Sequence, residues 1–252
     1  MSRMNLDAQL EDAGLKALDD ALRQSAYDAL PPQRRASLKT TLALVEAVYG
    51  QHGASWIGQH RPELGFSHSL HKNPAQWTLC VLGAGFAAAP RLAAAIMTAR
   101  LAGQENILLA WEGAPEDPSL LTVLDLTGIE RAYASSKPDW KAVETALREN
   151  CGPDGRVMLF GTRATFSLPC WHDCPPVLAA DSAVDREILH WAHPDATWAS
   201  DEAQPTAFCG ATPTTEAALH LEPGLEGTWL CPGLESDFFM SLRRKILLYE
   251  NV

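Results

Sequence analysis

Apolar residues recur at helical spacing through the first fifty positions of the chain. The first stripe predicts an amphipathic helix over residues 5–29, which stops before Pro31–Pro32 because proline cannot continue a helix. A second predicted helix ends at Gly50 and carries on one face Leu38, Leu42, Val45 and Tyr49. Residues 54–75 show no such periodicity and contain proline, glycine and histidine, so we expect a loop there.

The middle of the chain alternates short apolar runs with helical segments. Four runs are predicted as strands: Trp77–Leu82, Ile107–Trp111, Ile129–Ala134 and Val157–Phe160. They recur roughly every 25 residues with predicted helices between them, which is the rhythm of parallel strands joined by helical crossovers. The pattern predicts an α/β fold: a mainly parallel, Rossmann-like sheet with flanking helices.

The periodicity weakens after Gly161. Residues 169–176 favour a turn, residues 182–192 a helix, and residues 194–235 contain much Pro, Thr and Gly, so we expect only short strands there. Ser236 is the expected N-cap of a last helix, through Tyr249. The predicted organisation is a helical N-terminal segment (1–75), an α/β nucleotide-binding-like domain (76–165) and an irregular C-terminal lobe (166–252).

Composition and charge exclude several classes of protein. With 46% hydrophobic and 20% charged residues, the 252-residue chain has the composition of a globular protein. Its net charge of −11 repels a phosphate backbone, so nucleic acid is not an expected partner. The most apolar region, residues 79–109, is interrupted by glycine, proline and arginine, and we expect no membrane span. Six scattered cysteines without a secretion signal favour reduced thiols in the cytoplasm.

A glycine-rich turn follows the first predicted strand. Its sequence, Gly83-Ala84-Gly85-Phe86-Ala87-Ala88, fits the pattern G-x-G-x-x-G/A between a strand and a helix. In such turns Gly83 would allow the tight bend, Gly85 would let the backbone approach a pyrophosphate, and Ala88 would let the helix pack on the strand. This spacing predicts binding of NAD or another small anionic ligand. A purely structural tight turn is the alternative.

Two further residues are candidates for the same site. The nucleotide-binding pattern calls for an acid after the second strand to hold the ribose hydroxyls, and Glu112 occupies that place, somewhat late in the sequence. Arg163 follows the fourth predicted strand, at the sheet edge where open α/β sheets bind ligands, and could hold a phosphate or carboxylate. An ordinary surface arginine is the alternative for Arg163.

The segment of roughly residues 30–135 resembles the N-terminal half of histidinol dehydrogenases. The resemblance rests on Gly83-Ala84-Gly85, on Ala88-Ala89-Pro90, on the helix end Ala99-Arg100-Leu101-Ala102-Gly103, and on the segment from Gly128 to Tyr133. It implies a histidinol-dehydrogenase-like α/β fold and a nucleotide site at the glycine turn.

The chain departs from that family where its chemistry resides. Arg91-Leu92 replaces small hydroxyl residues, and residues 134–138 do not match the family's Gly-Gly-Ala-Gln-Ala turn. No counterpart of the adjacent Glu-His pair or of the C-terminal zinc ligands is found, and we assign no catalytic residue. We therefore expect a divergent, shortened relative without histidinol oxidation that binds a small-molecule ligand. The alternatives are an active NAD(P)-dependent oxidoreductase and a non-enzymatic structural or interaction protein. Besides a small-molecule ligand, a second copy of the chain in a homo-oligomer is the partner considered.

One short segment contains metal-ligand chemistry. Cys170, His172 and Cys174 place two thiols and an imidazole within five residues. Zinc takes four such ligands, but the usual second pair with matching spacing is missing. A turn with partly buried thiols is the simpler interpretation, so zinc is not expected.

Overall fold

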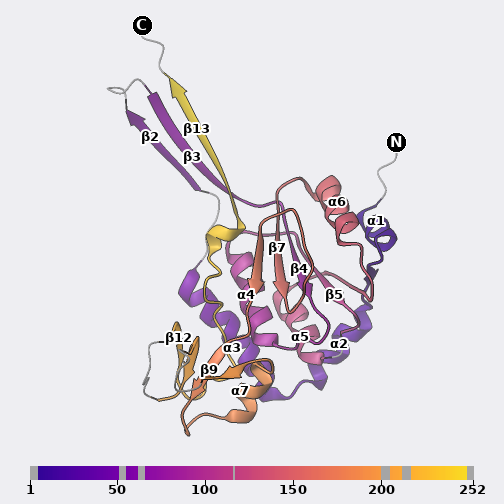
Figure 1. Ribbon diagram of the computed structural model, residues 1–252, viewed down its shortest axis with the longest axis vertical. Coiled ribbons are helices and arrows are strands. Elements are labelled where there is room, and N and C mark those ends of the chain that lie inside the picture. The colour runs from indigo at the N-terminus through magenta and orange to yellow at the C-terminus, as the bar shows by residue number, and fades with distance from the viewer. Residues whose placement is uncertain are drawn as a thin grey trace.

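The computed structural model describes residues 5–50, 55–61, 66–115, 117–199, 205–211 and 217–248, which form three sheets with flanking helices (Figure 1). The main sheet has the order β1-β6-β5-β4-β7-β8. Its strands are β1 (Lys16–Ala17), β4 (Trp77–Leu82), β5 (Ile107–Glu112), β6 (Arg131–Ser135), β7 (Gly155–Phe160) and β8 (Cys170–Asp173). All neighbours are parallel except β1 and β6, which confirms the predicted α/β architecture.

Helices cover both faces of this sheet, as Figure 1 shows. One face packs against α1 (Leu6–Asp12) and α6 (Trp140–Cys151) through a core that includes Trp77, Leu79 and Val81 of β4. The other face receives Cys80 and Leu82. On that side lie α2 (Asp20–Ala29), α3 (Pro32–Tyr49), α4 (Ala89–Leu101) and α5 (Pro118–Thr127). Because β4 is buried on both faces, its sequence is a continuous apolar run.

Aspartate side chains fix where several helices begin. Asp19, Asp117, Asp139 and Asp185 are N-caps whose carboxylates accept hydrogen bonds from backbone N–H groups of the first turn of α2, α5, α6 and α7 (Arg186–Ala192). Gly128 ends α5 in the left-handed conformation, with φ of 66°. Both ends of α5 therefore follow from local sequence signals: Asp117 at its start and Gly128 at its end.

The remaining strands form a C-terminal lobe and a projecting arm. The lobe has a parallel sheet in the order β10-β9-β11-β12, and α7 lies in the same part of the chain. These strands are β9 (Val177–Ala180), β10 (Thr197–Trp198), β11 (Ala207–Cys209) and β12 (Leu219–Leu221). The arm is the antiparallel sheet of β2 (Ser55–Arg61), β3 (Phe66–Pro74) and β13 (Met240–Leu248), and it extends away from the body (Figure 1).

Four sequence predictions of local structure were wrong. The expected loop at 54–75 contains β2 and β3, and the expected helix from Ser236 is a 3-10 turn (Ser236–Phe239) followed by β13. The expected turn at 169–176 contains β8, and the expected single helix over 5–29 is divided by β1 into α1 and α2. In each case a strand pairs with a distant segment, which local periodicity does not reveal. Residues 54, 62–65 and 249 of these ranges lie outside the described residues.

A buried ion cluster connects α4 to the C-terminal lobe. Arg91 is fully buried, and its Nη2 lies 3.2 Å from Asp173 Oδ2 and 2.5 Å from Asp195 Oδ2. Its Nε and Nη1 have no hydrogen-bond partner among the described residues. Burial raises the pKa of Asp173 to about 6, against the lowering effect of Arg91. Burial and the charge of Arg91 lower the pKa of nearby His193 to about 3, so this imidazole is neutral.

Replacing Arg91 with methionine should destabilise the protein by about 3–5 kcal/mol at pH 7.5, because it leaves the Asp173 carboxylate buried without a counter-charge. In the folded protein the pKa of Asp173 lies above its ordinary value, so protonation of this carboxyl stabilises the folded state. This contribution to the free energy of unfolding is lost as the pH rises through about 6. The deficit of Arg91→Met should therefore shrink at pH 5. Urea unfolding at both pH values measures it.

The matched control is Arg23→Met, because Arg23 pairs with the exposed Asp20 carboxylate and its loss should cost about 1 kcal/mol or less. A deficit of Arg91→Met that equals the control, or that does not change between pH 7.5 and pH 5, would contradict a stabilising role for the buried pair.

Candidate functional site

The first glycine of the turn is required by the neighbouring strand. Gly83 follows β4, and its N–H donates a 2.8 Å hydrogen bond to the carbonyl oxygen of Phe160, the last residue of β7. A Cβ atom added at Gly83 would collide with the carbonyl group of Gly161. Gly83 therefore lets the ends of β4 and β7 approach each other, which is a structural role rather than contact with a ligand.

The second glycine faces open space. Gly85 has φ of +86°, a conformation that favours glycine, and a Cβ atom built there would meet no heavy atom within 4 Å. The backbone N–H groups of Gly85 and Ala87 make no hydrogen bond among the described residues. Ala88 is fully buried and is the N-cap position of α4, so its small side chain permits close packing of helix on strand. The backbone at Gly85 is thus open to a ligand.

A cavity of about 340 Å³ lies beside this turn, at the carboxyl edge of the main sheet. The turn residues 83–87 form one wall, and the end of β5 with residues 111–114 forms the other. Asp117 and Leu120, at the start of α5, complete the described lining. Its volume is at the lower end of the range for small-molecule sites. The structure therefore brings Gly83, Gly85 and Glu112 to one cavity, whereas Ala88 lies buried behind it.

The position of this cavity follows from the sheet order. Counted from the glycine turn, the parallel strands β6-β5-β4-β7-β8 have the order 3-2-1-4-5, which is that of doubly wound dinucleotide-binding sheets. In such sheets ligands bind outside the carboxyl ends of the strands, and the acid that holds the ribose follows the second strand. Glu112 is the last residue of β5, so it occupies that position despite its late place in the sequence.

The electrostatics of the cavity come from two carboxylates and the start of α4. Glu112 Oε1 accepts a 3.2 Å hydrogen bond from Trp140 Nε1, and Asp117 Oδ1 accepts a 2.7 Å bond from the N–H of Ser119. Neither the described lining residues nor the turn includes a lysine or arginine. Positive potential at this site therefore comes from free backbone N–H groups and the N-terminal end of α4.

Phe86 leaves the cavity open. Its side chain is only 9% exposed, and its ring centroid lies 5.2 Å from that of Phe160. The guanidinium carbon of Arg91 lies 5.5 Å from the centre of the same ring. Phe86 thus packs toward the core and forms part of the cavity wall rather than filling the space above the turn.

The other predicted site residues lie elsewhere. Arg163 is exposed in the segment between β7 and β8 and is not part of the described cavity lining. Cys170 and His172 belong to β8, and Cys174 is exposed just beyond it. Within the described ranges, no group of three or more His, Cys, Asp or Glu side chains is arranged to hold a metal ion. The predicted trio is therefore not brought together as a ligand set.

Sequence reasoning did not identify Asp117 as part of this site. The signal was present in Asp117-Pro118, because an N-cap aspartate followed by proline marks a helix start, here directly after a strand. All six cysteines are unpaired in the structure. Burial raises the pKa of Cys80, and it raises that of Cys209 to about 12, so neither thiol is a reactive nucleophile.

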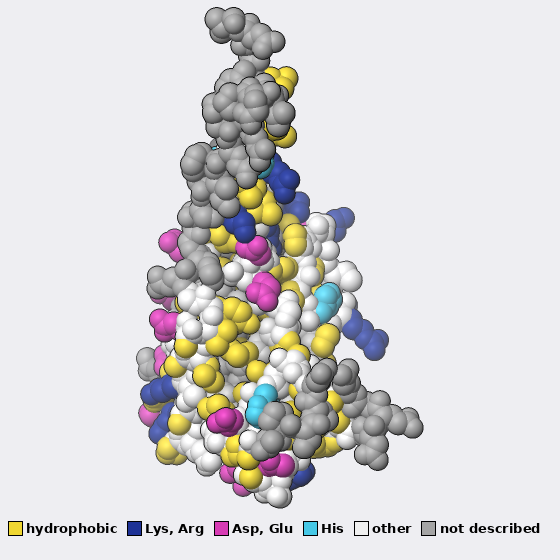
Figure 2. All heavy atoms as spheres, turned by 90° about the vertical axis from the view of Figure 1, so that its left-hand side faces the viewer, with side chains coloured by type: hydrophobic (Ala, Val, Ile, Leu, Met, Phe, Trp, Pro, Cys, Tyr) yellow, Lys and Arg dark blue, Asp and Glu magenta, His cyan; other side chains and the backbone are white. Residues whose placement is uncertain are grey.

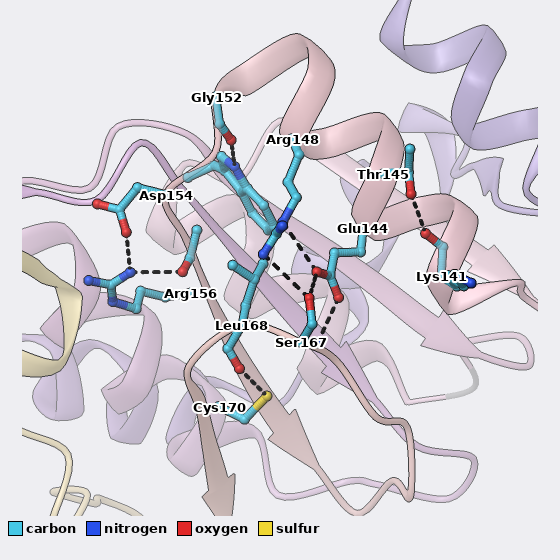
Figure 3. Close-up of polar contacts among 12 residues, drawn as sticks. Lys141, Glu144, Thr145, Arg148, Gly152, Asp154, Arg156, Ser167, Leu168 and Cys170 are labelled. Carbon is cyan, nitrogen blue, oxygen red and sulfur yellow. Dashed lines mark hydrogen bonds and ion pairs between the residues drawn. The ribbon is translucent and has the colours of Figure 1, made fainter.

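A second polar cluster lies on α6, shown in Figure 3. The carboxylate of Glu144 accepts hydrogen bonds from the N–H and the hydroxyl of Ser167, and Arg148 Nε lies 3.2 Å from Glu144 Oε1. A cavity of about 470 Å³ adjoins these residues. Because both Glu144 oxygens are engaged, the cluster holds the segment between β7 and β8 on α6, and we assign it a structural role.

Two dehydrogenases of known structure are similar to this chain to different degrees. A histidinol dehydrogenase from Elizabethkingia anophelis matches with a TM-score of 0.52 and 11% identity, over 92% of this chain and 76% of that chain. An NAD-dependent benzaldehyde dehydrogenase from Corynebacterium glutamicum matches with a TM-score of 0.36 and 10% identity, over 82% of this chain and 55% of that chain. No family model and no curated protein matches the sequence. The first likeness shows a shared dehydrogenase-like fold and nothing about activity.

The two glycines of the turn should respond differently to an added methyl group. Gly83→Ala should destabilise the protein by about 1–3 kcal/mol or more, because backbone must move to remove the clash with Gly161. Gly85→Ala should cost about 1 kcal/mol, because only its positive φ is unfavourable for alanine. Chemical unfolding of both variants measures the difference. Equal losses would show that the contact between Gly83 and Gly161 is not tight in solution.

Proposed function

We propose that this chain binds a dinucleotide of the NAD type at the glycine turn and does not oxidise histidinol. The observation that supports it is the cavity at the ends of β4 and β5, whose lining includes both Gly85 and Glu112. The free N–H groups near Gly85 suit a pyrophosphate, and the Glu112 carboxylate suits ribose hydroxyls as hydrogen-bond acceptor.

The charge of the cavity favours NAD over NADP. A 2′-phosphate on the ribose would lie against Glu112, and Asp117 adds a second carboxylate to the same lining. The chain offers no arginine or lysine among the described lining residues to accommodate that phosphate. The same absence of positive side chains disfavours ligands with three phosphates.

The lack of identifiable acid–base machinery supports the second half of the proposal. Among the described lining residues there is no histidine, cysteine or lysine that could accept a substrate proton. The Glu112 carboxylate is the proposed partner of the ribose hydroxyls, and the Asp117 carboxylate caps the start of α5. If the chain uses NAD in a redox reaction, the residues that exchange protons with the second substrate must lie outside this lining. The active-oxidoreductase alternative therefore needs a further site.

Isothermal titration with NAD, NADP and ATP tests the proposal. NAD should bind, NADP should bind at least about tenfold more weakly, and Gly85→Val should weaken NAD binding at least about tenfold because its side chain enters the space left open at Gly85. Glu112→Gln should weaken NAD binding by a similar factor and reduce the preference for NAD over NADP, because it removes the charge that faces the ribose.

The matched control is Gly233→Val. Gly233 has φ of +77° and open space around it, like Gly85, but it lies outside the described cavity lining. It should lose similar stability and keep full NAD binding. If no nucleotide binds the wild-type chain, the purely structural interpretation of the turn is correct. Formation of NADH from NAD and histidinol would contradict the proposed absence of oxidation.

A further inference from the structure

The arm formed by β2, β3 and β13 exposes hydrophobic side chains. Four of the seven large hydrophobic residues that are exposed in the described part of the chain lie in β13. Leu242, Ile246 and Leu248 are 55%, 65% and 82% exposed, and they alternate along the strand, so they share one face. Opposite Leu248 on β3 lies Phe66, and Leu70 lies opposite Arg244, on this same face.

This apolar face belongs to a sheet that has no second layer in the described structure. In the view of Figure 1 the arm extends beyond the helices that cover the main sheet. Isolated sheets of two or three strands need a packed face to be stable in water. The length and exposure of the arm therefore indicate a surface that is covered by another molecule.

The charges of the arm are opposite to those of the body. None of the three strands contains an acidic residue, whereas they hold Arg61, Lys72, Arg243, Arg244 and Lys245. Beyond the described ends of these strands the sequence adds Glu63 and Glu250. The whole chain nevertheless has a net charge of −11, so the body carries all of the negative excess. In Figure 2 Lys and Arg side chains lie along the arm and also at several places on the body, whereas the visible Asp and Glu side chains lie on the body and at the base of the arm.

We propose that a second copy of this chain covers the arm, with the apolar face of each arm packed on the acidic body of the other copy. The opposite charges of arm and body make the chain complementary to itself. A symmetric pair uses the contact twice, since each copy gives one arm and receives one.

The dimensions of the arm agree with a stable interface. A nine-residue strand is about 30 Å long and three strands span about 10 Å, so each face of the arm has about 300 Å². In a dimer two such faces are buried, and each buries an equal area on the other copy. The total buried area is then about 1,200 Å², which is the lower limit for specific interfaces. An anionic membrane would also attract the arm, but it would repel the strongly acidic body, so a second copy is the favoured occupant.

The groove between α1 and α6 is one acidic surface of suitable character on the body. It has a volume of about 420 Å³, and its charged lining residues are three acids and one base: Asp12, Asp139, Glu149 and Lys141. Ala142 and Ala146 are its apolar lining residues. Carboxylates around an apolar floor complement a face that combines leucine and isoleucine with arginine. This groove belongs to elements of the body, so an arm from another copy can approach it.

Sedimentation equilibrium of the full chain tests the proposal. The wild-type protein should dimerise, and Ile246→Asn should raise the dimer dissociation constant at least about tenfold. Leu247→Asn is the matched control, because Leu247 is 49% exposed in the same strand but points to the opposite face. It should change the dissociation constant by less than about threefold. Both side chains are exposed, so neither variant should unfold the protein.

Salt distinguishes the proposed contact from packing of one arm on another. Raising the ionic strength from about 0.05 M to about 0.5 M should weaken a dimer held by a basic arm on an acidic body. It should strengthen a dimer in which two basic arms meet. A wild-type monomer at about 100 μM, a dimer strengthened by salt, or equal effects of the two asparagine variants would overturn the proposal. Binding of a monomer to phosphatidylserine vesicles would assign the arm to a membrane surface instead.

Discussion

The parallel pairing of β4 with β5 and β7 is the constraint on which the candidate site depends. Leu82 is in register with Trp111 of β5 and with Phe160 of β7, so the three strands end at the same level. The glycine turn, Glu112 and Gly161 therefore meet at one edge of the sheet although they are far apart in the sequence. This edge is so crowded between β4 and β7 that no side chain fits at Gly83, whereas the space between β4 and β5 remains open. The cavity lies on the open side.

Arg91 explains why the site depends on backbone groups for its positive potential. It lies in the first turn of α4, where a cation could contact an anionic ligand beside the glycine turn. The side chain is instead fully buried and bound to Asp173 and Asp195. The two ion pairs of Arg91 connect α4 to β8 and to the segment after α7. A ligand at the turn would therefore meet the N–H groups of Gly85 and Ala87, which suits a ligand of modest negative charge.

The fold separates charge and exposure in a way that the composition conceals. The net charge of −11 is the sum of the charges of a basic arm and of a more strongly acidic body. The arm joins β2 and β3 to β13, so its basic and apolar face exists only when segments far apart in the sequence pair with each other. No helix in the described residues is both long and apolar enough to cross a membrane.

The sequence by itself determined the elements whose signals are local. The apolar run of β4, the glycines of the turn, the aspartate caps and the period of the crossover helices specify the α/β core, because each depends on neighbouring residues. It also predicted Glu112 as a site residue, and the structure places this residue in the lining of the cavity beside the turn. Three features were decided only by the tertiary structure. The carbonyl group of Gly161 leaves no room for a side chain at Gly83, Arg91 is buried against Asp173, and residues 240–248 form a strand. All three features depend on contacts between segments that are far apart in the sequence. Such contacts produce no periodic pattern of apolar residues in either segment, because an edge strand is stabilised by the strand to which it is hydrogen-bonded.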